Sequence, residues 1–148
     1  MDPGSTAPGE TLDDHPPVAL VVDDSETMAR LTGRMLERLG WRVEVAHDGI
    51  SGLEIGTRIP TLRLVVTDQE MPGLRGEAMA RSLLAARADL RIVIASGAIE
   101  TVEAWDPRVA LLAKPFTPEG LEAAIVALGL GRQVGLATPA ASGARPGT

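Results

Sequence analysis

The sequence contains no cysteine, and its fourteen basic residues include a single lysine, Lys114. Without cysteine the chain can form neither a disulfide framework nor a thiolate metal site, which fits a reducing compartment. It also lacks the basic start and apolar run of a signal peptide, and no stretch approaches the roughly 20 apolar residues that span a bilayer. These absences predict a soluble, cytoplasmic protein.

Positive charge is scarce as well. The formal net charge is −6 and the pI is near 4.9. Domains that bind the phosphate backbone of nucleic acids usually carry a basic face or stripe. We therefore expect no nucleic-acid partner.

The chain divides into a core and two ends of different composition. Residues 1–17 and 131–148 are rich in Pro, Gly, Ser, Thr and Ala, and we expect both to be disordered or linker. The hydrophobic content of 45% suffices for one compact domain, which we place at residues 18–130.

Short apolar, β-branched runs recur along this domain and predict five strands. They are VALVV (18–22), RVEVA (42–46), LRLVVTD (62–68), RIVIAS (91–96) and VALLA (109–113). Three of the runs are continuously apolar, as in strands buried on both faces of a parallel sheet, whereas RVEVA alternates and is typical of an edge strand.

Helical spacing appears between the strand runs. The first helix is predicted by four apolar residues at spacings of three and four, followed by Gly40 as a stop signal; these residues are Met28, Leu31, Met35 and Leu39. Weaker periods follow, and Thr117, Pro118 and Glu119 mark the start of the last helix. Strands alternating with helices predict an α/β, doubly wound parallel sheet with helices on both faces.

Chemistry-bearing residues stand at four of the predicted strand ends: Asp23, Asp24, Asp68, Ser96 and Lys114. Each alone has a simpler interpretation as a helix cap or turn residue. In a doubly wound sheet, however, the carboxyl ends of the strands form the working site. Two unit charges about 4 Å apart cost roughly 4 kcal/mol at an effective dielectric of 20, so three gathered carboxylates require a compensating cation.

Two compensating cations are available, the Lys114 ammonium and a bound divalent ion. Mg²⁺ suits such a site because it prefers oxygen ligands and needs only one or two carboxylates. Carboxylate, metal and ammonium together indicate phosphoryl transfer with an aspartate as nucleophile. A compact ammonium on a flexible stem can follow a phosphoryl oxygen without a planar, two-pronged partner, which explains lysine rather than arginine.

Four motifs in this order resemble the receiver domain of bacterial response regulators, which is CheY-like. They are VVDDSETMARLTGRMLERLG, VVTDQEMPGLRG, IASG and AKPF, and the resemblance covers about residues 18–130. It implies a flavodoxin-like fold with strand order 2-1-3-4-5. The features KPFTPEGLEAAI and a short helix before the fifth strand are also similar to the C-terminal receivers of hybrid histidine kinases, so a free-standing regulator and a kinase fragment both remain open.

The resemblance implies a role for each acid. Asp68 accepts a phosphoryl group from a histidine kinase or a histidine phosphotransfer protein. Asp24, Asp68 and the backbone carbonyl of Glu70 hold Mg²⁺, and Asp23 assists through water. The chain is then a phosphoacceptor rather than an enzyme, with self-phosphorylation from small donors and self-dephosphorylation as its only expected reactions.

The resemblance also implies how the signal leaves the site. Ser96 bonds to a phosphoryl oxygen after modification, Lys114 pairs with the phosphoryl group, and the Lys114–Pro115 peptide is cis. The loop after the fourth strand then follows Ser96 and alters a protein-interaction surface read by a downstream target.

This chain departs from the family pattern at three places. Leu111 stands three residues before the lysine, where the family usually has Tyr or Phe, so an aromatic-switch mechanism is not expected. Only 18 residues separate Ser96 from Lys114, which predicts a short or irregular helix before the fifth strand. Arg75 replaces a frequent Asp and is interpreted as a solvated turn residue.

Three further alternatives are weighed. The Glu70 side chain either reaches the phosphorylation site and affects the attack of water, or it is a solvent-facing loop residue. At the level of function, the fold could act as an interaction module without phosphorylation. A Mg²⁺-dependent Asp phosphohydrolase of the haloacid dehalogenase type is disfavoured, because its nucleophile lies on the first strand with an acid two residues later, where this chain has Ser25.

Overall fold

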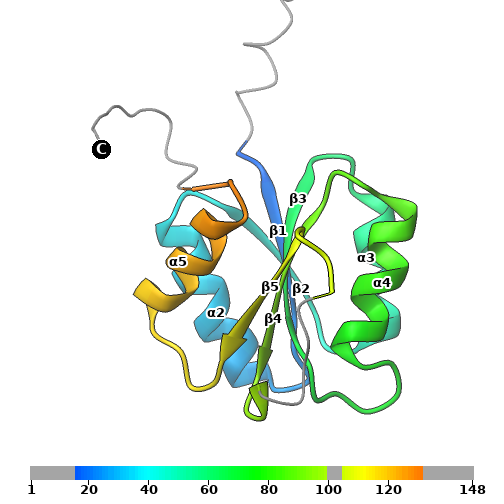
Figure 1. Ribbon diagram of the computed structural model, residues 1–148, viewed down its shortest axis with the longest axis horizontal. Helices are drawn as coiled ribbons and strands as arrows, with labels where there is room; N and C mark the ends of the chain where they lie inside the picture. Colours follow the sequence, from blue (N-terminus) through cyan, green and yellow to red (C-terminus); the bar gives the residue numbers. More distant parts are fainter. Residues whose placement is uncertain (1–15, 100–104, 132–148) are drawn as a thin grey trace, which may run out of the picture.

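The computed structural model describes residues 16–99 and 105–131, which form a five-stranded parallel sheet with helices on both faces (Figure 1). The strands are β1 (Val18–Val22), β2 (Arg42–Ala46), β3 (Leu62–Asp68), β4 (Arg91–Ser96) and β5 (Val109–Ala113). Their order is β2-β1-β3-β4-β5, and every neighbouring pair is parallel. The predicted fold class and strand order are confirmed.

Burial follows the sequence pattern of the strands. All five residues of β1 are buried, as are the last five of β3 and of β4, which explains their continuous apolar runs. The alternating run RVEVA forms β2 at one edge of the sheet, with only Ala46 buried. The predicted edge strand is therefore confirmed, and β5 forms the other edge.

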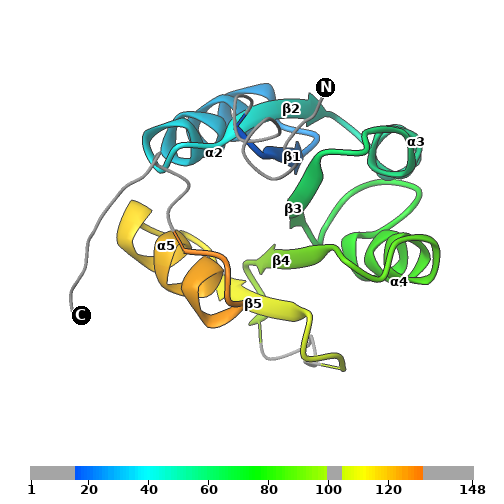
Figure 2. The ribbon, with the colours of Figure 1, turned by 90° about the horizontal axis from the view of Figure 1, so that it is seen from above.

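Four helices cover the sheet in the described residues: α2 (Glu26–Arg38), α3 (Gly49–Arg58), α4 (Gly76–Ala86) and α5 (Pro118–Ala127). Seen from above, α2 and α5 lie on one side of the sheet and α3 and α4 on the other (Figure 2). Each side encloses its own hydrophobic core, one built around Leu36, Leu121 and Ile125 and the other around Met79 and Leu83.

The helix that follows β1 begins and ends where the sequence indicates. The Ser25 hydroxyl accepts a hydrogen bond from the Met28 N–H, and Gly40 follows the helix with φ of 96°. The buried side of α2 consists of Ala29, Thr32, Gly33 and Leu36. The apolar spacing that predicted the helix thus lies beside this face, and its member Leu31 is 47% exposed.

The last helix has the predicted start. The Thr117 hydroxyl accepts from the Gly120 N–H, and Pro118 occupies the first turn, where its missing N–H costs nothing. The expected short helix before β5 falls on residues 100–104, which lie outside the described residues. Shortly before β5, Asp106 and Arg108 form an ion pair. Hydrogen bonds from Arg108 are the main reason that the pKa of Asp106 is lowered to about 2.

Trp105 is a partly buried residue on the side of the sheet that α3 and α4 cover. Its ring packs against that core, and the guanidinium carbon of Arg81 lies 4.0 Å from the ring centroid. None of the helices in residues 16–99 and 105–131 is long and apolar enough to cross a membrane.

Candidate functional site

Three carboxylates meet at the carboxyl edge of the sheet. Asp23 and Asp24 follow β1, Asp68 ends β3, and one oxygen from each lies within 4.8 Å of the others. Asp23 and Asp68 are buried, whereas Asp24 is exposed. The structure therefore brings together the acids that the sequence placed at separate strand ends.

Lys114 faces this cluster from the end of β5. Its Nζ lies 3.2 Å from Asp68 Oδ1, and the Asp68 side chain is only 7% exposed. The Lys114 N–H donates to the Ser96 carbonyl, which continues the β4–β5 pairing up to the site. The Lys114–Pro115 peptide is cis, as expected from the sequence.

Asp23 is held by the turn into α2. Its Oδ1 accepts from the Ser25 N–H at 2.9 Å, and its own N–H donates to the Ala46 carbonyl on β2. Burial raises the pKa of the Asp23 carboxyl and the neighbouring Asp68 carboxylate raises it further, while the Ser25 N–H and Lys114 oppose this shift. An anionic Asp23 is therefore costly unless another cation shares the site.

The backbone carbonyl of Asp23 contacts a histidine. His47 Nδ1 lies 3.1 Å from this carbonyl oxygen, from the segment after β2. The His47 side chain is exposed. Nothing in the spacing of the sequence signals that it contacts the β1 turn.

Gln69 positions the loop after Asp68, and sequence reasoning missed it. This buried residue donates its N–H to the Ala95 carbonyl, and its Oε1 accepts from the Glu77 N–H at 2.8 Å in the first turn of α4. Gly76 also approaches the loop closely, because a Cβ there would lie 2.4 Å from the Asp68 carbonyl oxygen. The phosphoacceptor candidate is thus tied to both β4 and α4.

Ser96 and Glu70 contact one another at the rim of the site. Ser96 Oγ donates to Glu70 Oε2 at 2.6 Å and accepts from the Ala98 N–H at 3.0 Å. Ser96 is fully buried at the end of β4, whereas Glu70 is exposed. The Glu70 side chain therefore contacts Ser96 from an exposed position. Its effect on the attack of water stays a prediction.

The donor set fits a hard divalent cation. All three acids offer oxygen ligands from a small region, and Lys114 supplies one positive charge beside them. Beside Asp23, Asp68 and Lys114 the interior leaves only about 10 Å³, room for a water-sized group. The site therefore suits an ion at its open side rather than an enclosed organic ligand.

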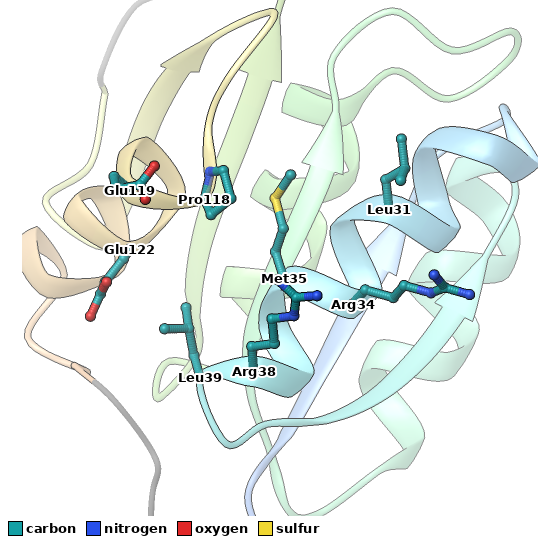
Figure 3. A pocket seen from close by; sticks show the side chains of 8 residues that line it. All are labelled: Leu31, Arg34, Met35, Arg38, Leu39, Pro118, Glu119 and Glu122. Carbon is teal, nitrogen blue, oxygen red and sulfur yellow. The ribbon is translucent and has the colours of Figure 1, made fainter.

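A much larger groove, of about 380 Å³, lies between α2 and α5 (Figure 3). Its apolar floor includes Met35 and Leu39, with Arg34 on the α2 side and Glu119 on the α5 side. None of the carboxylates of the acidic cluster lines it. The candidate functional site therefore remains the acidic cluster at the strand ends, although the groove is larger.

Two sequence departures are also placed by the structure. Leu111 lies on β5 opposite Ile94 and packs against the core beneath α3 and α4, so no aromatic ring occupies that position. Arg75 is exposed at the turn before α4 and makes no side-chain cap, in agreement with its interpretation as a turn residue.

Comparison with known proteins gives a consistent family. Residues 19–126 match the model of the response regulator receiver domain. A chemotaxis protein CheY homolog of Campylobacter jejuni is 32% identical over 110 residues, covering 70% of this chain and 85% of the relative. Hybrid signal transduction histidine kinase D of Dictyostelium discoideum is 34% identical over 128 residues, which are 76% of this chain and 8% of the kinase.

Solved structures agree with these sequence relatives. A response regulator of Burkholderia pseudomallei, determined with a phosphorylated aspartic acid, a calcium ion and citrate, superposes with a TM-score of 0.62 at 27% identity, covering 73% of this chain and 65% of that one. Because the family model and the relatives cover most of the described fold, this chain belongs to the response regulator receiver domains of two-component signalling.

Proposed function

We propose that Asp68 is the phosphoacceptor of this receiver domain. The observation that carries the proposal is the position of its carboxylate, buried at the end of β3, grouped with Asp23 and Asp24 and 3.2 Å from the Lys114 ammonium. Of the three acids, Asp68 is the one paired with Lys114. That pairing leaves a cation beside the carboxylate that would carry the phosphoryl group.

The donor is a phosphohistidine on a histidine kinase or a phosphotransfer protein. An oxygen of the Asp68 carboxylate attacks phosphorus, the P–N bond breaks, and the departing imidazole nitrogen keeps the electron pair and takes up a proton. Lys114 neutralises charge on the transferred group as it arrives, and the buried setting strengthens this interaction. The similarity to a hybrid histidine kinase supports this class of partner.

Asp23, Asp24 and Asp68 would hold Mg²⁺, together with the backbone carbonyl of Glu70. The all-oxygen donor set, in which three carboxylates lie close together beside the Lys114 ammonium, supports a cation here. When bound, the ion neutralises negative charge on the phosphoryl oxygens and the carboxylates. The residues of this chain would supply the ligands and the nucleophile, and Gln69 ties the loop after Asp68 to the first turn of α4.

Modification would be passed on through Ser96. A phosphoryl group on Asp68 would add charge and acceptor oxygens near the end of β4, where Ser96 carries a hydroxyl. Movement of Ser96 would carry the loop that leaves β4 and change the surface near β5 and α5, which a downstream protein target reads. A phosphorylation-independent interaction module is the alternative.

Intact-mass measurement with acetyl phosphate tests the proposal. The wild-type chain should gain one phosphoryl group, with acetate as the leaving group, when Mg²⁺ is present and much less when it is removed with EDTA. Asp68→Asn should gain none. The Asp24→Asn variant is the matched control, because it removes a charge from the same cluster while leaving the nucleophile in place.

Each outcome decides between the candidates. Phosphoryl transfer that persists in Asp68→Asn would place the acceptor elsewhere. No modification of the wild type, either by acetyl phosphate or by phosphohistidine donors, would favour the phosphorylation-independent module. Slow modification of Asp24→Asn, with none of Asp68→Asn, would assign the nucleophile and the metal ligand separately.

A further inference from the structure

The donor capacity of Ser96 is already used in this structure. A serine hydroxyl has one hydrogen to donate, and Ser96 Oγ gives it to Glu70 Oε2 over 2.6 Å. One of its lone pairs accepts from the Ala98 N–H. A hydroxyl in this state cannot donate to a second acceptor at Asp68 without first releasing Glu70.

The geometry points to Glu70 as a latch that holds Ser96 in its unphosphorylated position, and this inference rests on the proposed function. We call the hydrogen bond from Ser96 Oγ to Glu70 Oε2 the Glu70–Ser96 latch. It would make Glu70 a positioning residue that acts through Ser96. Phosphorylation would open the latch because the phosphoryl oxygens compete for the same hydrogen.

Charge favours this competition once Asp68 is modified. Glu70 follows Asp68 by two residues, and β3 pairs with β4 such that Asp68 lies opposite Ala95, next to Ser96. A phosphoryl group on Asp68 would therefore bring added negative charge toward the Glu70 carboxylate. Repulsion of Glu70 and attraction of the Ser96 hydroxyl act in the same direction.

The connections of Ser96 explain how the latch would reach the surface. The Ala98 N–H is bonded to the hydroxyl, and the Ser96 carbonyl accepts from the Lys114 N–H. A change at the hydroxyl is thus transmitted first to the turn at Gly97 and Ala98 rather than to an aromatic ring on β5, where this chain has Leu111. The latch supplies a two-state element for a receiver without the usual aromatic residue.

A double-mutant cycle separates the latch from simple charge removal. The probe is beryllofluoride, a non-covalent mimic of a carboxylate-bound phosphoryl group, titrated in the presence of Mg²⁺ and followed by NMR of the full chain. Glu70→Ala should bind the probe about tenfold more tightly than the wild type, the size of one hydrogen bond to a charged group. In the Ser96→Ala background the same substitution should change affinity less than about twofold.

The Ala98 amide gives a second readout that a purely structural role would not move. In Glu70→Ala without probe, its resonance should shift from the wild-type free position toward the wild-type bound position. Glu70→Gln, which keeps the shape and a weaker acceptor, should lie between wild type and Glu70→Ala in both measurements. Glu54→Ala, which removes an exposed acid on α3, is the charge control and should match wild type.

Different results would contradict the Glu70–Ser96 latch and the assignment of Asp68 as phosphoacceptor. Equal tightening by Glu70→Ala with and without Ser96 would reduce the effect to electrostatics and overturn the latch, as would no tightening in either background. Failure of the proposed function has another signature, because Asp68→Asn would then bind the probe as the wild type does. If Glu70→Ala does not fold, the Glu70→Gln cycle carries the same test.

Discussion

At the scale of single residues, the acidic cluster lowers the stability of the folded protein. Asp23 is 7% exposed and shares its surroundings with Asp24 and Asp68, against one ammonium from Lys114. Burial raises the pKa of Asp23, which means that its anionic form is disfavoured in the folded protein. Without a compensating cation, an ionised Asp23 therefore lowers the stability of the folded protein.

Replacing Asp23 by Asn should therefore stabilise the metal-free protein, by about 1 kcal/mol if the effect has the size typical of a point substitution. Asn keeps an oxygen that can accept from the Ser25 N–H, so the turn into α2 should remain. Urea unfolding at neutral pH in the presence of EDTA measures the difference. A loss of stability would show that the negative charge of Asp23 is better compensated than its burial and neighbours indicate.

The same comparison has a defined pH dependence. Because the folded pKa of Asp23 lies above the ordinary value of 3.8, the folded state binds the proton more readily than the unfolded state does. The stability of the folded protein therefore falls as pH rises through the window between 3.8 and the raised pKa. The advantage of Asp23→Asn should accordingly be full at neutral pH and vanish below about pH 4. A pH-independent advantage would assign the gain to something other than this ionisation.

The sequence predicts the site residues at strand ends but not the contacts made by loop residues. Asp23, Asp24, Asp68 and Lys114 stand at strand ends, and the topology of a parallel sheet alone brings strand ends together. The hydrogen bonds that join loops depend on the path of each loop, which no periodicity encodes. The contacts of Glu70, Gln69 and His47 were for that reason found only in the structure.

At the scale of elements, close packing at α4 fixes the loop that carries Asp68. A Cβ at Gly76, the first residue of α4, would lie 2.4 Å from the Asp68 carbonyl oxygen and 3.0 Å from the Gln69 Cα. Both are backbone atoms and cannot move aside without shifting the site. At Gly56 on α3, by contrast, the nearest atom is Leu83 Cδ2, the end of a flexible side chain, at 2.6 Å.

We expect Gly76→Ala to destabilise the protein by about 2 kcal/mol or more, whereas Gly56→Ala should stay within about 1 kcal/mol of wild type. In the second variant the better helix propensity of Ala offsets the displacement of Leu83. Chemical denaturation of both variants measures this difference. Equal losses in the two variants would mean that the loop after Asp68 yields as easily as a leucine side chain.

The helices also show how far spacing determines packing. Spacing located α2 correctly, but the face buried against the sheet is Ala29, Thr32, Gly33 and Leu36. Three of these four residues are small or polar, and Leu36 is the large apolar side chain among them. Three of the apolar residues whose spacing predicted the helix instead line the α2–α5 groove, namely Leu31, Met35 and Leu39. Periodicity thus predicts where a helix forms, but it is less reliable in predicting which neighbour each helical residue contacts.

At the scale of the whole molecule, the site joins parts of the chain that are far apart in sequence. β1 and β3 lie side by side in the sheet, whereas Lys114 comes from the edge strand β5 and reaches Asp68 across the end of β4. A ligand held by Asp23, Asp24 and Asp68 would connect two strands and the turns that follow them. Binding there should consequently be coupled to global unfolding rather than to a local loop.

Magnesium should therefore raise the melting temperature of the whole domain. A ligand present at 100 times its dissociation constant stabilises the folded state by about 2.7 kcal/mol, which corresponds to an upward shift of about 5 °C or more for a domain of this size. Calorimetry across a Mg²⁺ series measures the shift, with NaCl at equal ionic strength as the control, because salt alone also screens the repulsion among the carboxylates.

The melting temperature of Asp24→Asn should rise much less with Mg²⁺, since this substitution removes the exposed ligand while Asp23, Asp68 and Lys114 remain. An equal rise with NaCl would show that screening, and not a bound ion, accounts for the stabilisation, and the proposed phosphoryl transfer to Asp68 would then lose its proposed cation.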